Sequence, residues 1–132
     1  MLHRRHFTVE QANRVLPAVR AIVHRLRGAR RREAVRKFDT ELATHAEATG
    51  GAWPGRARAR DAVEVALGFA RLERLGLVVR DVDRGLVDFP ALMAGREVYL
   101  CWLDDEPAVS HWHEIEAGFR GRRPLWVDRL SR

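Results

Sequence analysis

Six consecutive residues near the C-terminus, His111-Trp112-His113-Glu114-Ile115-Glu116, form the densest set of potential metal ligands in the sequence. Imidazole and carboxylate groups suit zinc, iron, manganese or nickel, and two histidines with one carboxylate are a known non-haem iron set. On a β-strand, His111 and His113 would share a face. On a helix they would point in nearly opposite directions, and His113 would share a face with Glu116 instead.

A helix is the expected structure of this segment, because acidic residues 104–106 and then Pro107 precede it, as is typical of a helix N-terminus. A zinc or iron site on this helix would use His113 with Glu116 or Glu114 and would be completed from the preceding strands. The ligand candidates on those strands are Asp88, Glu97 and Cys101. The alternative interpretation is a solvated surface helix in which Trp112 and Ile115 pack inward.

Asp88 lies in the otherwise apolar segment 86–89. A buried carboxylate is costly unless it has a cation, a hydrogen-bond donor or a metal. We therefore expect Asp88 and His113 to lie close together on one side of a sheet, near Glu97 or Arg96. Removing the carboxylate would then cost on the order of 2–4 kcal/mol. A purely structural salt bridge would explain Asp88 equally well.

The sequence contains one cysteine, Cys101, so an intramolecular disulfide and a cysteine-based zinc knuckle are excluded. In the middle of an apolar strand, a cysteine is typical of a small buried side chain. Cys101, His113 and Asp88 also have the composition of a thiol catalytic triad. Their spacing does not show that the three groups meet, so the sequence leaves both interpretations open.

The elements that must position these groups follow from the hydrophobic periodicity. Thr8 and Gln11 have capping-box spacing and are followed by an apolar stripe at three- and four-residue steps. This pattern predicts either one bent helix over residues 8–49 or two helices separated near Gly28. A second helix is expected over residues 56–75, antiparallel to the first. Strands are expected over 77–79, 86–89 and 97–103, and a short helix over 108–119.

The predicted fold class is α+β: a long antiparallel helical hairpin packed on a small three-stranded antiparallel sheet, with a short C-terminal helix. The length of 132 residues is that of a single domain, 1–132. Within it, the helical hairpin would cover about residues 8–75. The sheet and C-terminal helix would cover about 77–120, followed by a tail over 121–132.

The composition, with 46% hydrophobic and 32% charged residues, is that of a folded protein. The sequence has neither an apolar run of roughly 20 residues nor a secretory signal, so we expect a cytoplasmic protein with no membrane partner. The formal net charge is +6, and Lys37 is the only lysine among the 24 Lys and Arg residues. The basic run from Arg25 to Lys37 could contact phosphates. It lacks interleaved aromatic residues and a nucleic-acid-binding motif, which favours a solvated helix.

Four stretches of the sequence carry a family resemblance. They are Phe7-Thr8-Val9-Glu10-Gln11-Ala12-Asn13 with Leu16-Pro17, Gly85-Leu86-Val87-Asp88-Phe89-Pro90-Ala91, Gly95-Arg96-Glu97-Val98-Tyr99-Leu100-Cys101-Trp102, and Trp112-His113-Glu114 followed by Gly118-Phe119. These motifs resemble an uncharacterised bacterial family, catalogued as domain of unknown function 2203. The resemblance covers nearly the whole chain except about residues 28–60. It implies no activity, but an aromatic residue often stands at the position of His111, which makes His113 the better ligand candidate.

Three functions are consistent with the sequence. The leading hypothesis is a small accessory or ligand-binding protein that holds a divalent metal near His113 and takes a small-molecule ligand. The second is a metal-dependent enzyme, a hydrolase or an oxygenase, that uses His113 with Asp88 and a glutamate. The third is a nucleic-acid-associated protein that uses the N-terminal arginines. The apolar surface of the helices and of the third strand exceeds what a small monomer easily covers, so we also expect a homodimer.

Overall fold

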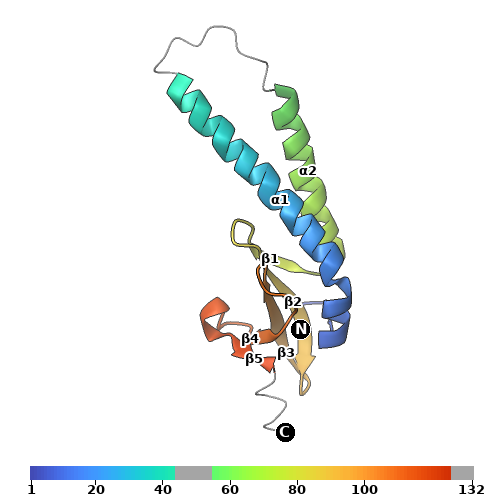
Figure 1. Cartoon of the computed structure of the whole chain (residues 1–132). Coiled ribbons are helices and arrows are strands. Elements are labelled where there is room, and N and C mark those ends of the chain that lie inside the picture. The colour runs from blue at the N-terminus through green and yellow to red at the C-terminus, as the bar shows by residue number, and fades with distance from the viewer. Residues whose placement is uncertain (44–54, 126–132) are drawn as a thin grey trace.

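The computed structural model describes residues 1–43 and 55–125 and has an α+β fold, as expected (Figure 1). Two helices, α1 (Val9–Ala43) and α2 (Gly55–Arg74), lie side by side and project beyond a β-sheet (Figure 1). The strands are β1 (Val78–Asp81), β2 (Leu86–Met93), β3 (Arg96–Leu103), β4 (His111–Glu114) and β5 (Arg123–Pro124). A short 3₁₀ helix, η1 (Phe119–Gly121), precedes β5. The predicted residues 44–49 of the first helix and 126–132 of the tail lie outside the described residues.

Helix α1 begins at the predicted capping box. The Thr8 hydroxyl accepts a hydrogen bond from the Gln11 backbone N–H at 3.1 Å, and the Gln11 side chain accepts one from the Thr8 backbone N–H at 3.0 Å. The helix continues through Gly28 without a break, which decides between the two alternatives that the sequence left open in this region. Its apolar stripe is buried in the core shared with the sheet. The stripe consists of Ala12, Leu16, Val19, Val23 and Leu26.

Polar contacts join the two helices where they project beyond the sheet. Asp61 of α2 is buried and accepts hydrogen bonds from Arg32 at 2.8 Å and from Arg36 at 2.7 Å, both on α1. These hydrogen bonds lower the pKa of Asp61 to about 2. Part of the basic run is therefore neutralised within the chain. In the described part of the chain, neither helix combines the length and the apolar character that crossing a bilayer requires.

The five strands form one antiparallel sheet in the order β1-β2-β3-β4-β5. Alternation along each strand divides the sheet into two faces. We call one of them the core face, because its residues belong to the hydrophobic core that α1 completes. The core face carries Val87, Phe89, Val98, Leu100, Trp102 and Trp112. The opposite face, which we call the ligand face, carries Asp88, Tyr99, Cys101 and His113. These four residues are also buried.

Two parts of the predicted fold class are wrong: the sheet has five strands rather than three, and no short helix covers residues 108–119. Residues 111–114 form strand β4 instead, because they can pair with the free edge of β3. Side chains in β4 alternate, so that Trp112 enters the core and His113 points to the ligand face. The acidic residues that suggested a helix start have other roles. One of them, Glu106, accepts a hydrogen bond from the backbone N–H of Leu103 at 2.7 Å.

The turn between β1 and β2 packs tightly on the end of β3. Gly85 has a φ angle of 68°, and a Cβ atom placed on it would stand 2.5 Å from the Cβ of Asp104. Gly95, in the turn between β2 and β3, has a similar φ angle of 78° but meets no atom within 4 Å. The two glycines therefore share the backbone requirement and differ in the space around them.

Gly85→Ala should lower the free energy of unfolding by roughly 1–3 kcal/mol more than Gly95→Ala, because overpacking adds to the shared cost of a left-handed alanine. Urea unfolding followed by circular dichroism measures both changes. Equal destabilisation by the two substitutions would contradict the close packing of Gly85 on Asp104.

Candidate metal centre

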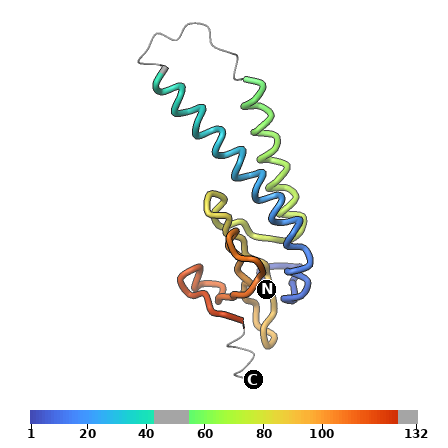
Figure 2. The backbone as a smooth tube through the Cα atoms, in the orientation of Figure 1, coloured from blue at the N-terminus to red at the C-terminus, as the bar shows by residue number. Residues whose placement is uncertain are grey.

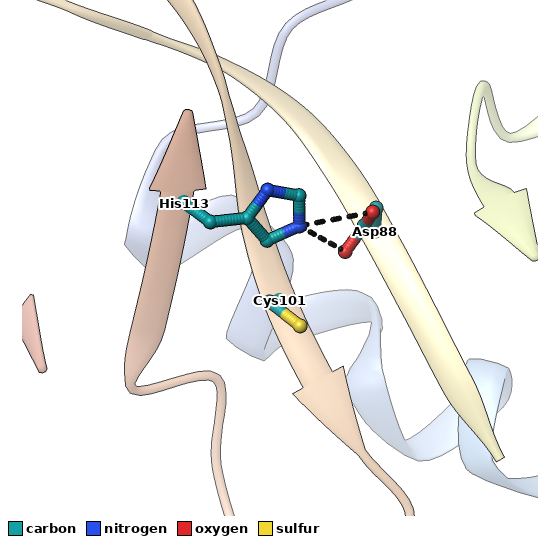
Figure 3. A group of neighbouring side chains, drawn as sticks. All are labelled: Asp88, Cys101 and His113. Atoms are coloured by element: carbon teal, nitrogen blue, oxygen red, sulfur yellow. Dashed lines mark hydrogen bonds and ion pairs between the residues drawn. The ribbon is translucent and has the colours of Figure 1, made fainter. Parts of the chain in front are cut away.

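Three neighbouring strands place a carboxylate, a thiol and an imidazole together on the ligand face. Asp88 of β2 lies opposite Cys101 of β3 in the strand register, and His113 of β4 lies opposite Tyr99, two residues before Cys101. The three side chains point to the same side of the sheet (Figure 3). One potential ligand atom from each of Asp88, Cys101 and His113 lies within 4.8 Å of the others. We call these three residues the Asp-Cys-His cluster.

Both ring nitrogens of His113 have hydrogen-bond partners. Nδ1 lies 2.7 Å from the backbone carbonyl oxygen of Glu114, and Nε2 lies 3.1 Å from each carboxylate oxygen of Asp88. A carbonyl oxygen can only accept a hydrogen bond, so Nδ1 carries a proton and Nε2 is the nitrogen directed into the cluster. The expected proximity of Asp88 and His113 is therefore present, although a strand rather than a helix produces it.

The protonated form of His113 is favoured despite its burial. Burial by itself disfavours the charged ring, but the hydrogen bonds to Asp88 and to the Glu114 carbonyl outweigh it, aided by the negative charge of Asp88. The pKa of His113 is consequently raised above its ordinary value. The hydrogen bonds with Asp88 and Glu114 therefore extend the pH range over which the buried ring keeps its second proton.

Arg80 is a second cation that binds Asp88. Its Nε donates to Asp88 Oδ2 at 2.9 Å, and its guanidinium lies over the Tyr99 ring at 4.9 Å. The Arg80 side chain is 43% exposed, whereas that of Asp88 is 2% exposed. Arg80 therefore reaches the cluster from the protein surface, and Asp88 is compensated from two sides.

Cys101 is held as a neutral thiol. It is fully buried, and burial, followed by the nearby charge of Asp88, raises its pKa to about 12. Arg122 opposes this rise. Its Nη2 donates to the Cys101 carbonyl oxygen at 3.1 Å and to Glu106 at 2.5 Å. Its Nε is buried and finds no hydrogen-bond partner among the residues that the structure describes. A positive charge and an unused donor therefore stand beside Cys101.

This geometry does not support the thiol-triad hypothesis. In a catalytic triad, one ring nitrogen of the histidine forms a hydrogen bond with the nucleophile, and the other forms one with the carboxylate. Here the Glu114 carbonyl occupies Nδ1 and Asp88 occupies Nε2, so no nitrogen of His113 remains for Cys101. The thiol is also inaccessible and difficult to ionise. The cluster therefore contains the residue types of a thiol triad, but no hydrogen bond joins the thiol to the imidazole.

The other site residues predicted from the sequence have different partners. His111 lies opposite Cys101 in the strand register, but its Nδ1 lies 3.3 Å from Glu106. Glu114 pairs with Arg96 at 2.7 Å, both at the rim of the sheet. Two more candidates lie outside the cluster: Trp112 packs on the core face, and Glu116 is exposed.

Glu97 binds the N-terminal segment rather than the cluster. Its carboxylate accepts hydrogen bonds from the Leu2 and His3 backbone N–H groups, at 2.8 and 3.2 Å, and lies 2.7 Å from His6 Nε2. The hydrogen bond with His6, together with the two from the backbone, lowers the pKa of Glu97 to about 2. His3 Nε2 lies 2.6 Å from the Tyr99 hydroxyl, so this segment also covers part of the ligand face.

Two residues of this face carried little or no signal in the sequence. Tyr99 stands two residues before Cys101, and this spacing places both side chains on one face of a strand. Arg122 comes from a segment that was expected to be only a tail, and no local pattern connects it with Cys101. Only the pairing of β4 with β5 brings it back over the sheet.

The family resemblance seen in the sequence motifs is confirmed by a match to the family of uncharacterised conserved proteins DUF2203. The match spans residues 5–125, which include the helical hairpin, the sheet and all three cluster residues. The chain belongs to DUF2203. No curated protein and no solved structure matches it. The description of this family, uncharacterised conserved proteins, assigns no activity.

Asp88→Asn should destabilise the DUF2203 chain by about 2–4 kcal/mol, because a buried imidazolium loses its anion. The same substitution should lower the pKa of His113. Because this pKa is raised in the folded state, the pair contributes fully below about pH 6.5, and the contribution is lost as the pH rises through the raised value. The destabilisation should therefore diminish at alkaline pH. Histidine NMR titration and urea unfolding at several pH values measure the two effects.

Asp83→Asn is the matched control, because Asp83 is an exposed carboxylate that pairs with Arg30 at 2.8 Å. It should leave both the His113 titration and the unfolding almost unchanged. Equal effects of the two substitutions would show that Asp88 is not the anion that keeps His113 protonated.

Proposed function

We propose that this DUF2203 protein is an accessory protein that binds one divalent transition-metal ion, zinc or iron, through Asp88, Cys101 and His113. The observation that carries the proposal is the convergence of three different ligand types from three strands, with their ligand atoms within 4.8 Å of one another. Convergence from separate strands requires the folded sheet, and it is therefore more specific than a cluster of neighbouring residues in the sequence.

The donor set suits a transition metal better than calcium or magnesium. A thiolate is a soft ligand that favours zinc or iron, whereas calcium and magnesium prefer oxygen ligands. The Nδ1–H of His113 donates to a backbone carbonyl, which is the usual way of orienting a metal-binding imidazole through its other nitrogen. Three protein ligands would leave one position of a tetrahedral ion for another donor.

The charges around the cluster also support the proposal, because a metal ion could replace the positive charges that now compensate Asp88. A bound metal ion would take over the role that Arg80 and the His113 proton now have in compensating Asp88. Arg80 can leave without a burial penalty, because its side chain is already partly in solvent. Arg122, with its unused Nε donor, would stabilise the Cys101 thiolate that a metal requires.

Burial favours an accessory role over the enzyme hypothesis. Asp88, Cys101 and His113 are 1%, 0% and 2% exposed. A metal-dependent hydrolase or oxygenase needs an open coordination position that its substrate can reach. Ligands that solvent and substrate do not reach are better suited to a metal that is held tightly or that supports the fold.

Cobalt(II) titration of the purified chain tests the proposal. We expect one equivalent to bind and to give the near-ultraviolet charge-transfer band of a cobalt–thiolate bond, and zinc should displace it. Cys101→Ser should abolish this band, and His113→Gln should weaken cobalt binding by roughly 10–100-fold or more, because a ligand is removed.

Glu116→Gln is the control, because Glu116 was a ligand candidate in the sequence but lies exposed outside the cluster. It should bind cobalt like the unmodified chain. The proposal is wrong if no charge-transfer band appears, or if the band survives in Cys101→Ser.

Metal affinity should depend steeply on pH. Binding must remove the Cys101 proton, whose pKa is about 12, and also the His113 proton below the raised pKa of the imidazole. The apparent association constant should therefore rise about a hundredfold per pH unit below the pKa of His113 and about tenfold per unit above it. Calorimetry in buffers of different ionisation enthalpy counts the released protons. An affinity independent of pH would contradict binding by this cluster.

A further inference from the structure

The helical hairpin exposes most of the large hydrophobic side chains that the protein leaves in solvent. Six of them lie on α1 and α2 and are 39–60% exposed: Val35, Phe38, Leu42, Val63, Leu67 and Phe69. The hairpin projects beyond the sheet, so the sheet does not cover this surface (Figures 1 and 2). Such a concentration of exposed apolar side chains on one element is typical of an interaction surface.

Two of these six residues, Val63 and Leu67, line a groove between the two helices. We call it the hairpin groove. Its apolar lining includes Ile22 of α1 and Val63 and Leu67 of α2. Gly68 also lines it, and the close approach of Leu26 to Gly68 leaves no room for a side chain there, since an added Cβ would stand 2.6 Å from Leu26. The groove therefore lies where the two helix backbones come close together.

Three arginines, Arg25, Arg60 and Arg71, line the same groove. In the described part of the chain, none of them forms an ion pair. Other hairpin arginines do have acidic partners in the chain. Examples are Arg30 with Asp83, Arg32 and Arg36 with Asp61, and Arg58 with Glu33. The one acidic residue among those that line the groove, Glu64, lies 3.3 Å from Arg32. The groove thus has an apolar floor and an uncompensated positive border.

We propose that the hairpin groove docks an amphipathic helix with acidic flanks from a partner protein. A helix laid along two antiparallel helices would bury its apolar stripe on Ile22, Val63 and Leu67 and complete a three-helix bundle. Glutamates or aspartates beside that stripe would meet Arg25, Arg60 and Arg71, so that charge and shape select the same partner.

Two other occupants fit this groove less well. A second copy docked about a two-fold axis would bring the arginines of one groove against those of the other, which is unfavourable. An anionic membrane is flat and would contact the borders of a concave groove rather than its apolar floor. The homodimer expected from the sequence is therefore a competing outcome of the experiment.

Fluorescence anisotropy with two labelled 18-residue helical peptides tests the proposal on the full chain. Both peptides carry leucine at positions i, i+3, i+4 and i+7; one has glutamate on its polar face, and the other has lysine. The glutamate peptide should bind, more weakly at higher salt, and the lysine peptide should not. Arg60→Glu combined with Arg71→Glu should weaken binding at least about tenfold, and Leu67→Gln should also weaken it.

Arg14→Glu combined with Arg31→Glu is the control, because it makes the same change in net charge at exposed α1 positions that do not line the groove. It should keep most of the affinity. Absence of binding by the glutamate peptide, equal binding of both peptides, or equal losses in the two double variants would overturn the proposal. A dimer in light scattering that Leu67→Gln dissociates would assign the groove to a second copy, and binding only to phosphatidylserine vesicles would assign it to a lipid surface.

Discussion

The burial of His113 between the Asp88 carboxylate and the Glu114 carbonyl is the constraint on which the ligand face depends. The ring can make these contacts only if β4 is a strand paired with β3, because this register turns His113 toward Asp88 and Trp112 toward the core. The same pairing returns the chain through β5, so that Arg122 reaches Cys101. The contact between His113 and Asp88 thus depends on β4 being a strand. The same strand also pairs with β5 and so places Arg122 beside Cys101.

Local signals in the sequence are sufficient to predict some helices and strands but not others. The capping box at Thr8, the long apolar stripe after it and the apolar runs of β2 and β3 all act within a few residues, and the elements that they predict are present. For strand β4 the local pattern is misleading, because the acidic residues before Pro107 resemble a helix start and predict a helix. What makes it a strand is the free edge of β3, whose paired residues lie 10–16 positions earlier in the sequence and contribute no local pattern.

Some residues of the candidate site can likewise be predicted from local sequence signals, and others cannot. Asp88 could be singled out because an isolated carboxylate among apolar strand residues needs a partner, and His113 was the natural choice. Cys101 was recognised as a potential third member, but only the register places it next to Asp88. The helix expected over 108–119 drew attention to Glu116, whereas a strand directs side chains two residues apart to one face. Arg122 could not be found, since its role depends on the path of the chain after β4.

The uninterrupted course of α1 gives the molecule a mechanical property. The part of α1 up to Leu26 is packed on the core face of the sheet, and the rest continues in the projecting hairpin to Ala43. At 1.5 Å per residue, this free part is a stiff arm of about 25 Å. Force applied to the arm by a bound protein would tilt α1 against Trp102 and its neighbours, directly behind Cys101. The Asp-Cys-His cluster would then be subject to strain that originates far from it in the sequence.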